Sequence, residues 1–324
     1  MQSLKSLILG GAGQDGVLLA SLLQSKGYEI HAVVRKGSNV ESLSSLAGEA
    51  VIHEGDATDR DLMTSLVTSI QPTEIYNLAA KSSVGGSWKH PELTIDANLF
   101  SILNLLEVVR SATTPEYGPR LYQASSSEMF GQAVESPQRE STQFRPLSPY
   151  AVSKAAAHFL AQTYREAYGM FVSCGILYNH ESRLRPASFV TRKITKAAAQ
   201  IKSGKQNSLQ LGTLDVSRDW GYAGDYVEAM WLMLQQDNPD DYIVATGKSR
   251  SLREFVETAF AAAGVEDWED RVSVDPALSR PTEVSRLVGD AAKAEVQLGW
   301  IPGTSFAKMI QGMVEHDLEL VSQR

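Results

Sequence analysis

Close to its N-terminus the chain reads Leu4-Lys5-Ser6-Leu7-Ile8-Leu9-Gly10-Gly11-Ala12-Gly13-Gln14-Asp15-Gly16. The apolar first half predicts a buried strand, and the leucines at 18, 19, 22 and 23 predict a helix directly after it. Regularly spaced glycines between a strand and a helix allow a tight turn, close approach to a pyrophosphate, and a helix N-terminus facing its charge. A glycine-rich turn without a ligand is the alternative. We expect a dinucleotide site that includes Gly10, Gly13, Gln14, Asp15 and Gly16.

The end of the next strand indicates which dinucleotide binds. Residues 29–34 predict the second strand, which ends in Arg35-Lys36. An acidic residue at this place suits the free ribose of NAD, whereas a basic residue suits the 2′-phosphate of NADP. Arg35 can contact a phosphate through two N–H groups, and Lys36 adds a point charge. The sequence therefore predicts NADP, the alternative being that both side chains are solvated surface charges.

Two more apolar runs continue the pattern. Residues 51–56 predict the third strand, and Asp56 at its tip can accept a hydrogen bond from an adenine amino group. We place its neighbour Ala57 at the same end of the cofactor. Residues 75–80 predict the fourth strand, whose last residues lie where a ribose and phosphates would pass; these are Leu78, Ala79 and Ala80.

The candidate catalytic residues lie in two stretches, Tyr122-Gln123-Ala124-Ser125-Ser126-Ser127-Glu128 and Tyr150-Ala151-Val152-Ser153-Lys154. Their spacing puts Tyr150 and Lys154 one turn apart on the same face of a helix. An ammonium beside a phenol favours the phenolate, so we expect Lys154 to lower the pKa of Tyr150 from ~10 and make it a base near neutral pH. The upstream strand ends in Ser126 and Glu128, which can face the same cleft.

Composition narrows the class of protein. The chain has 324 residues, a formal net charge of −8 and a pI near 5.4, which argue against binding to nucleic acid or a membrane surface. Its single cysteine, Cys174, excludes an intrachain disulfide, which suits a reducing cytosol. Neither an apolar run of ~18 residues nor a signal-peptide pattern is present, so we expect a cytoplasmic protein. The six histidines show no ligand spacing, and we assign no metal.

Strand and helix patterns alternate up to about residue 178, which predicts an α/β fold with a Rossmann-type doubly wound parallel sheet. Helices are expected at residues 59–70, 93–111 and 150–168. The last two keep apolar residues beyond one buried face. Core packing is the simplest interpretation of these residues, and a dimer made from the two helices is the alternative.

From residue 179 the pattern changes to loops with a helix near 191–203, and a helix at 225–235 and a strand at 241–246 then return to the sheet. We therefore expect two interleaved domains. The NADP-binding domain comprises residues 1–178 plus about 219–250, and a smaller α+β substrate domain comprises about 179–218 plus 251–324.

Further characteristic blocks are spread over nearly the whole chain. They are Pro72-Thr73-Glu74-Ile75-Tyr76-Asn77-Leu78, Asn179-His180-Glu181-Ser182, Phe189-Val190-Thr191-Arg192-Lys193, Arg218-Asp219-Trp220-Gly221, Asp225-Tyr226-Val227-Glu228-Ala229-Met230-Trp231 and Arg280-Pro281-Thr282-Glu283-Val284. With the glycine-rich turn and the Tyr-x-x-x-Lys spacing, they closely resemble the extended short-chain dehydrogenase/reductase superfamily. Within it, the chain is similar to the GDP-mannose 4,6-dehydratases.

The resemblance implies a lyase reaction in which NADP is regenerated in place. Tyr150, held as the phenolate by Lys154, would take the proton of the hexose 4-hydroxyl, and Ser126 would bind the oxygen on carbon 4. Glu128 would remove the carbon 5 proton and protonate the departing 6-hydroxyl. Family members usually carry threonine at position 126, where serine keeps the hydroxyl.

The resemblance also implies a binding site for a GDP-sugar. Asn179, Lys193, Arg218 and Arg280 would hold the diphosphate, Glu283 the nucleotide ribose, and Ser82 and Val190 would be further substrate contacts. Any one of these charges alone can instead be a surface ion pair. His180 resembles a residue near the nicotinamide amide, and a structural role with a backbone partner is the alternative.

Three departures from the family pattern concern assembly and the cofactor and substrate sites. The family has a longer basic loop after Arg35-Lys36 that helps build a tetramer, whereas residues 37–41 are short and scarcely basic, so we expect a homodimer, with a tetramer as the alternative. Arg183-Leu184-Arg185-Pro186 replaces the family's Pro-Arg-Arg-Gly, and Arg185, the one match, is implied to contact the cofactor. The segment 264–278 is also shorter, which leaves room for GDP-manno-heptose as substrate.

Other functions share this fold. A nucleotide-sugar epimerase or 4-keto reductase would use Tyr150 and Lys154 but needs no base for carbon 5, so Glu128 argues against both. The blocks at 179–193 and 280–284 argue against a UDP-sugar decarboxylase. A non-catalytic NADP-binding regulator has no need of Ser126, Glu128, Tyr150 and Lys154 together.

Overall fold

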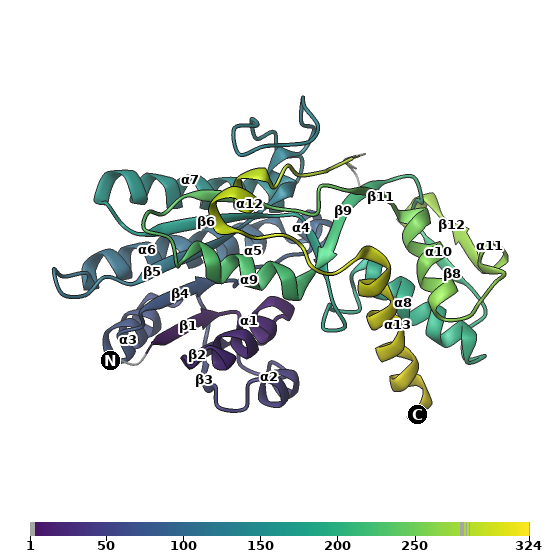
Figure 1. Ribbon diagram of the computed structural model, residues 1–324, viewed down its shortest axis with the longest axis horizontal. Coiled ribbons are helices and arrows are strands. Elements are labelled where there is room, and N and C mark those ends of the chain that lie inside the picture. The colour runs from purple at the N-terminus through teal and green to yellow at the C-terminus, as the bar shows by residue number, and fades with distance from the viewer. Residues whose placement is uncertain (1–3, 279–281, 283, 285, 324) are drawn as a thin grey trace.

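The computed structural model describes residues 4–278, 282, 284 and 286–323. Its centre is a seven-stranded parallel sheet with the strand order β10-β6-β5-β4-β1-β2-β3 (Figure 1). The strands are β1 (Lys5–Leu9), β2 (Glu29–Val34), β3 (Val51–Glu54), β4 (Glu74–Asn77), β5 (Arg120–Ser126), β6 (Val172–Leu177) and β10 (Asp241–Val244). The strand order reverses between β1 and β4, and ligands of such sheets bind beyond the carboxyl ends of the strands at this point.

Helices cover both faces of the sheet, as a doubly wound fold requires. One face packs against α1 (Gln14–Ser25), α2 (Glu41–Leu46), α9 (Ala223–Met233) and α12 (Ala292–Leu298). The other face packs against α3 (Arg60–Ile70), α6 (Ser101–Ala112) and α7 (Pro149–Tyr168). Each layer has its own buried apolar core, so the predicted Rossmann-type α/β architecture is confirmed.

A smaller unit lies beyond one end of the sheet (Figure 1). It contains a three-stranded sheet of β7 (Asn179–Glu181), β9 (Ser217–Tyr222) and β11 (Ser249–Ser251), and the pair β8 (Leu209–Leu211) and β12 (Val272–Val274). Around a third apolar core lie α8 (Val190–Lys202), α10 (Leu252–Ala262), α11 (Trp268–Arg271) and α13 (Phe306–Ser322). Between β9 and β11 the chain returns to the main sheet through α9 and β10, as the sequence predicted. Within the described residues, every helix is too short or too polar to cross a membrane.

Some element boundaries differ from those predicted. The single helix expected at 93–111 is divided into α5 (Pro91–Ile95), a π-helical turn η1 (Asp96–Phe100) and α6. Asn98 in this turn accepts from the N–H of Lys81 at 2.8 Å and donates to the Ser153 hydroxyl at 2.9 Å. It thus ties α7 to the loop after β4, a placement typical of π-bulges at functional sites. The third and fourth strands end two or three residues early because their last residues leave the sheet to line a cavity.

Candidate functional site

A cavity of about 910 Å³ lies at the carboxyl ends of the central strands. It brings together almost every residue proposed for the site from the sequence. On its wall are Gly10, Gly13, Gln14, Asp15, Gly16, Arg35, Asp56, Ala57, Leu78, Ala79, Ala80, Ser82, Ser126, Glu128, Tyr150, Lys154, Asn179, His180, Arg185, Val190, Lys193 and Arg218. Lys36, proposed from the sequence to add a charge beside Arg35, is exposed and is not among the residues that line the cavity, and Arg280 and Glu283 lie outside the described residues.

The glycine-rich turn is shaped by the close packing of its own backbone. Gly10 has a φ of +85°, and a side chain there would lie 3.0 Å from the backbone nitrogen of Ala79. A Cβ at Gly16 would overlap the carbonyl oxygen of Gly10. Gly13 is the N-cap of α1 and offers no side-chain acceptor, so the first N–H groups of the helix have no side-chain cap. Such a helix end suits a pyrophosphate.

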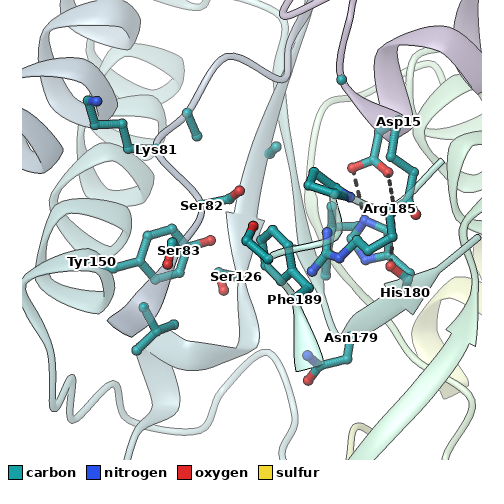
Figure 2. Close-up of a pocket in the computed structure, with 18 of the residues that line it drawn as sticks. Asp15, Lys81, Ser82, Ser83, Ser126, Tyr150, Asn179, His180, Arg185 and Phe189 are labelled. Atoms are coloured by element: carbon teal, nitrogen blue, oxygen red, sulfur yellow. Dashed lines mark hydrogen bonds and ion pairs between the residues drawn. The ribbon is translucent and has the colours of Figure 1, made fainter. Parts of the chain in front are cut away.

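Two side chains next to this turn contact the segment around β7. Gln14 donates to the carbonyl oxygen of His180 at 3.1 Å and accepts from the Ser182 hydroxyl at 2.9 Å. The Asp15 carboxylate lies 2.9 Å from His180 Nε2 (Figure 2). The other ring nitrogen of His180 lies 2.7 Å from the carbonyl oxygen of Tyr178, which is the structural role that the sequence left open. The dinucleotide turn and the β7 segment are therefore locked together.

The Asp15–His180 pair carries opposite charges in a buried setting. Burial disfavours the charged form of each group, but the attraction and hydrogen bond between the two groups outweigh this effect. The charge and hydrogen bond of His180 lower the pKa of Asp15, and those of Asp15 raise the pKa of the imidazole. We infer that the pair is ionised at mildly acid pH.

Arg35 and Asp56 line the cavity at the ends of β2 and β3, where both side chains are exposed. Asp56 accepts from the backbone N–H and the hydroxyl of Thr58, at 2.9 Å and 2.8 Å. These hydrogen bonds, with the nearby charges of Arg35 and Lys81, lower the pKa of the Asp56 carboxyl. This end of the cavity therefore offers both a cation and a hydrogen-bond acceptor.

The predicted catalytic residues meet where α7 begins. Ser148 caps this helix by accepting from the N–H of Ala151 at 3.1 Å, which fixes the turn that carries Tyr150. The Ser126 hydroxyl lies near enough to the phenol to lower its pKa, and it accepts from the N–H of Glu128 at 3.3 Å. In Figure 2, Tyr150 and Ser126 face the same space as Ser82. A phenol, a hydroxyl and a carboxylate thus share one small region.

The expected effect of Lys154 on the phenol is not what the structure shows. Burial raises the pKa of Tyr150 to about 12, and the charge of Glu128 acts in the same direction, against the Ser126 hydrogen bond. Lys154 is buried too, which lowers its pKa to about 8, and its ammonium donates to the carbonyl oxygen of Ala124 at 2.8 Å. The prediction that Lys154 lowers the pKa of Tyr150 is therefore wrong in this structure, because desolvation dominates.

The smaller unit supplies a basic wall. Lys193, in the first turn of α8, donates to the carbonyl oxygen of Gln210 at 2.8 Å. Arg218 on β9 donates to the carbonyl oxygen of Val284 at 2.7 Å. The Arg185 guanidinium lies 3.8 Å from the centre of the Phe189 ring, and its Nε lies 3.2 Å from a Glu181 oxygen. Three cations from separate segments therefore line one side of the cavity, which suits an anionic group such as a diphosphate.

Comparison with known proteins agrees with this geometry. The family model described as GDP-mannose 4,6 dehydratase matches residues 7–313. The chain belongs to this family. Among its relatives, GDP-mannose 4,6 dehydratase 1 of Arabidopsis thaliana is 47% identical over 98% of the chain and 91% of that protein. The Sinorhizobium fredii and human GDP-mannose 4,6-dehydratases are 46% and 42% identical, over 97% and 98% of the chain and 96% and 92% of their own lengths.

Solved structures of more distantly similar proteins share the fold of this chain. The UDP-glucose 4-epimerase of Thermotoga maritima superimposes with a TM-score of 0.88 at 21% identity, over 98% of the chain and all of that protein. RMD from Pseudomonas aeruginosa, complexed with NADPH, has a TM-score of 0.81 at 24% identity over 98% of each chain. Several structures of this fold were solved with a nicotinamide dinucleotide bound, NAD in a Thermus thermophilus UDP-glucose 4-epimerase and NADPH in RMD.

Some lining residues of the dehydratase-family cavity were not proposed from the sequence. Lys81 and Ser83 follow the fourth strand, and Phe189 and Thr191 flank Val190. In Figure 2, Phe189 lies between Ser126 and Arg185. The sequence pointed to Phe189 only through its position in the block 189–193. A phenylalanine by itself does not show whether it lines a cavity or packs in a core.

Folding also brings together three potential metal ligands that sequence spacing did not reveal. Within the described residues, the ligand atoms of His158, Cys174 and Asp241 lie within 4.8 Å of one another, and all three side chains are buried. The Asp241 carboxylate is already bound by both terminal nitrogens of Arg165, at 2.8 Å and 3.0 Å. Its charge is therefore matched by a guanidinium, and we assign no metal to this cluster.

Proposed function

We propose that this protein is a GDP-mannose 4,6-dehydratase, which converts GDP-D-mannose to GDP-4-keto-6-deoxy-D-mannose and water. The observation that supports it most is the position of Glu128. Its carboxylate lines the same cavity as Tyr150, Lys154 and Ser126, close enough for its charge to raise the pKa of the phenol. An epimerase or reductase has no use for this extra acid–base group.

Two residues act on the hydroxyl at carbon 4. Tyr150 accepts its proton, and Ser126 hydrogen-bonds to the oxygen that becomes the ketone. Since the pKa of Tyr150 is about 12, the phenolate needs neighbouring positive charge, and in the structure the charge that lowers this pKa is that of Arg185. NADP, when bound, would supply a hydride acceptor for the oxidation at carbon 4 and a hydride donor for the reduction at carbon 6.

Glu128 acts on the neighbouring carbons. The ketone at carbon 4 makes the proton on carbon 5 acidic, and Glu128 removes it as a general base. The same carboxyl group then donates this proton to the hydroxyl on carbon 6, which departs as water. The proton taken up by Tyr150 balances the one that carbon 5 regains when carbon 6 is reduced.

For the cofactor we propose NADP. The glycine-rich turn and the α1 N-terminus would hold the pyrophosphate, Asp56 the adenine, and Arg35 the 2′-phosphate, while Lys154 would hold the nicotinamide ribose. Replacement of Arg35 by Ser removes the cation that distinguishes the two dinucleotides. The ratio of NADP to NAD affinity, measured by calorimetry, should fall about tenfold or more. An unchanged ratio would contradict the role of Arg35.

The smaller unit is proposed to bind the GDP part of the substrate. Asn179, Arg218 and Lys193 would contact the diphosphate, and Ser82 and Val190 would lie beside the sugar. This assigns residues 179–218 and 251–324 to a substrate domain and the remainder to the NADP-binding domain, as the sequence suggested, except that α12 packs on the main sheet and belongs with the NADP-binding domain.

We further propose a cytoplasmic homodimer. Large apolar side chains are exposed along four adjoining helical segments, α4 (Val84–Lys89), α5, η1 and α7. They are Trp88, Leu93, Phe100, Val152 and Phe159. A contiguous apolar face of this kind is typical of an interface, and a second copy of the chain can cover it symmetrically.

Mass spectrometry of the products tests the function. GDP-mannose, and in parallel a GDP-manno-heptose, are incubated with the protein and NADP. Loss of one water from GDP-mannose without net formation of NADPH is the expected result. Water loss from the heptose alone would keep the mechanism and change the substrate, a reassignment for which the unusual segment Arg183-Leu184-Arg185-Pro186 beside the cavity leaves room. No reaction with either sugar would contradict the proposal.

A further inference from the structure

Helix α7 carries an unusual row of polar side chains on the face that packs against the sheet. Tyr150, Lys154, His158 and Gln162 follow one another at four-residue spacing, and Arg165 continues the row. Figure 1 shows α7 lying alongside β6. The buried face of a helix on a parallel sheet is normally apolar. His158, with 1% of its surface exposed, is central to this row and has no part in the dehydration chemistry.

The polar groups from Lys154 to Arg165 have partners on three strands of the sheet, β5, β6 and β10. Lys154 donates to the carbonyl oxygen of Ala124, and His158 Nδ1 lies 2.9 Å from the Ser125 hydroxyl, both on β5. Farther along, Arg165 donates to the carbonyl oxygen of Val172 at 3.0 Å, at the start of β6. The helix is thus hydrogen-bonded to the sheet along most of its length.

The far end of the row is anchored on β10. Gln162 Nε2 donates both to His158 Nε2 at 3.1 Å and to an Asp241 oxygen at 2.6 Å. Arg165 makes two further bonds to the same carboxylate. Because a carboxylate only accepts, the Gln162 amide orientation is determined, and His158 must accept at Nε2. Its proton is therefore on Nδ1, and His158 donates to Ser125.

This row restricts sliding of the helix along its axis. A shift by one residue moves each side chain about 1.5 Å, which is enough to break hydrogen bonds that tolerate only a few tenths of an ångström. The small apolar residues between them, Ala157 and Ala161, give little resistance to such a shift. Ser125, the partner of His158, lines the cavity and immediately precedes Ser126, whose hydroxyl lies beside the Tyr150 phenol.

We propose that His158 is a positioning residue for the dehydratase reaction. By donating to Ser125 and accepting from the Gln162–Asp241 anchor, it fixes Tyr150 and Lys154 against the end of β5. The inference rests on the proposed function, because the base that it positions is the one assigned to that reaction. His158 acts through Ser125 and the helix and touches neither substrate nor cofactor.

Three substitutions of His158 distinguish the roles of its two ring nitrogens. His158→Leu removes both hydrogen bonds. His158→Asn can keep a donor near the Nδ1 position, facing Ser125, whereas His158→Gln places its amide near the Nε2 position. We expect His158→Leu to lower kcat for GDP-mannose about 10- to 100-fold with little change in KM, as expected of a misplaced base. His158→Asn should recover most of the loss and His158→Gln little of it.

A matched control comes from another buried polar network. Tyr28 donates to Glu74 at 2.9 Å and accepts from Trp231 at 3.2 Å, on the opposite face of the sheet and away from the cavity. Tyr28→Phe removes buried hydrogen bonds as His158→Leu does, so both should lower Tm, but only His158→Leu should lower kcat. Hydrogen exchange of the α7 amides that follow Tyr150 gives a reading without substrate. Exchange should speed up in His158→Leu and not in Tyr28→Phe.

The outcomes are distinguishable. Unchanged kcat in His158→Leu despite a lower Tm would reduce His158 to a structural role and overturn the proposal. Equal activity of the Asn and Gln variants would also overturn it, because the hydrogen bond to Ser125 would then make no contribution to catalysis. Should His158→Leu fail to fold, Ser125→Ala tests the same contact from the strand side and should lower kcat. If the wild type does not dehydrate GDP-mannose, the proposed function fails, while hydrogen exchange still tests the positioning.

Discussion

The two ends of the cavity are built by different means. The proposed dinucleotide end is formed by backbone: one continuous segment, residues 10–16, in which glycines pack against one another and against Ala79. The substrate end is formed by side chains from separate segments, where Asn179, Lys193 and Arg218 extend from β7, α8 and β9. The packed backbone leaves no space for even one extra carbon atom. At the other end each side chain makes its own contact, so a substitution there removes one contact and leaves the others. Substitutions at the two ends should therefore have different effects on ligand affinity and on stability.

The largest effect is expected between the two ends, at Glu128. Glu128→Gln keeps the shape of the side chain and removes the acid–base group, which contributes ~10²- to 10⁴-fold to such reactions. We expect kcat to fall by this factor while oxidation at carbon 4 continues. The measurement is absorbance of the reduced nicotinamide in a single turnover, which should rise and persist. An enzyme that does not dehydrate, such as an epimerase, would be nearly indifferent to this change.

At the dinucleotide end, Gly16→Ala should have the next largest effect. A Cβ there overlaps the Gly10 carbonyl oxygen and lies 2.8 Å from the Cα of Gly11, so the turn must shift. Overpacking of this kind costs ~1–3 kcal/mol in the free energy of unfolding. NADP affinity, measured by calorimetry, should fall about tenfold or more, because the shifted backbone is the pyrophosphate site.

The matched control for this substitution is Gly312→Ala. Gly312 also lies within a helix, α13, but has no atom near its Cβ position. Alanine there should stabilise the protein by ~0.5–1 kcal/mol through helix propensity and leave NADP affinity unchanged. Equal behaviour of the two variants would show that helix propensity, and not the close packing of the turn, governs the dinucleotide end.

The same contrast explains how much of the molecule could be predicted from its sequence. The fold was accessible because periodicity and the glycine spacing are local signals. The π-helical turn at Asp96–Phe100 was not, since it depends on Asn98 meeting Lys81 and Ser153, which come from distant parts of the chain. The exact ends of the third and fourth strands depend in the same way on the cavity that they border.

In the site, residues were easier to predict than their environments. Tyr150 and Lys154 could be chosen from spacing alone, and they do share a cavity. The pKa values of these two residues could not be predicted, because the sequence does not show that both side chains are buried or that Lys154 donates to the carbonyl oxygen of Ala124. Burial reverses the expected direction of the Tyr150 pKa. Likewise, Phe189 and Lys81 became cavity residues only through tertiary packing.

At the substrate end, a graded loss is expected from Lys193→Met. Removing one of several cations should raise KM for GDP-mannose about tenfold, the effect of one charge-assisted hydrogen bond, and leave kcat nearly unchanged. Steady-state kinetics measures both. The control is Lys202→Met at the other end of α8, where the ammonium also donates to a backbone carbonyl oxygen, that of Gly264, at 2.9 Å. A rise in KM in both variants would point to helix α8 as a whole rather than to the Lys193 charge.

The smallest effect is expected where the two ends meet, at Asp15 and His180. The raised pKa of His180 means that its stabilising charge is fully present below ~6.5 and is lost as the pH rises through its folded-state pKa. The lowered pKa of Asp15 means that its share is present above ~3.8 and is lost only in stronger acid. The pair should therefore stabilise the protein most between ~pH 4 and ~pH 6.5, and progressively less above that range.

Asp15→Asn tests this pH dependence by removing one charge while keeping an amide of similar size. The free energy of unfolding, measured by chemical denaturation, should fall by of order 1 kcal/mol at about pH 5.5 and by less at about pH 8. A loss that grows with pH would mean that the pair is not ionised as described. If the loss of unfolding free energy were equal at every pH, the two groups would contribute only through a neutral hydrogen bond and not through their charges. In either case the two ends of the cavity would be joined by Gln14, through its bonds to His180 and Ser182, rather than by charge.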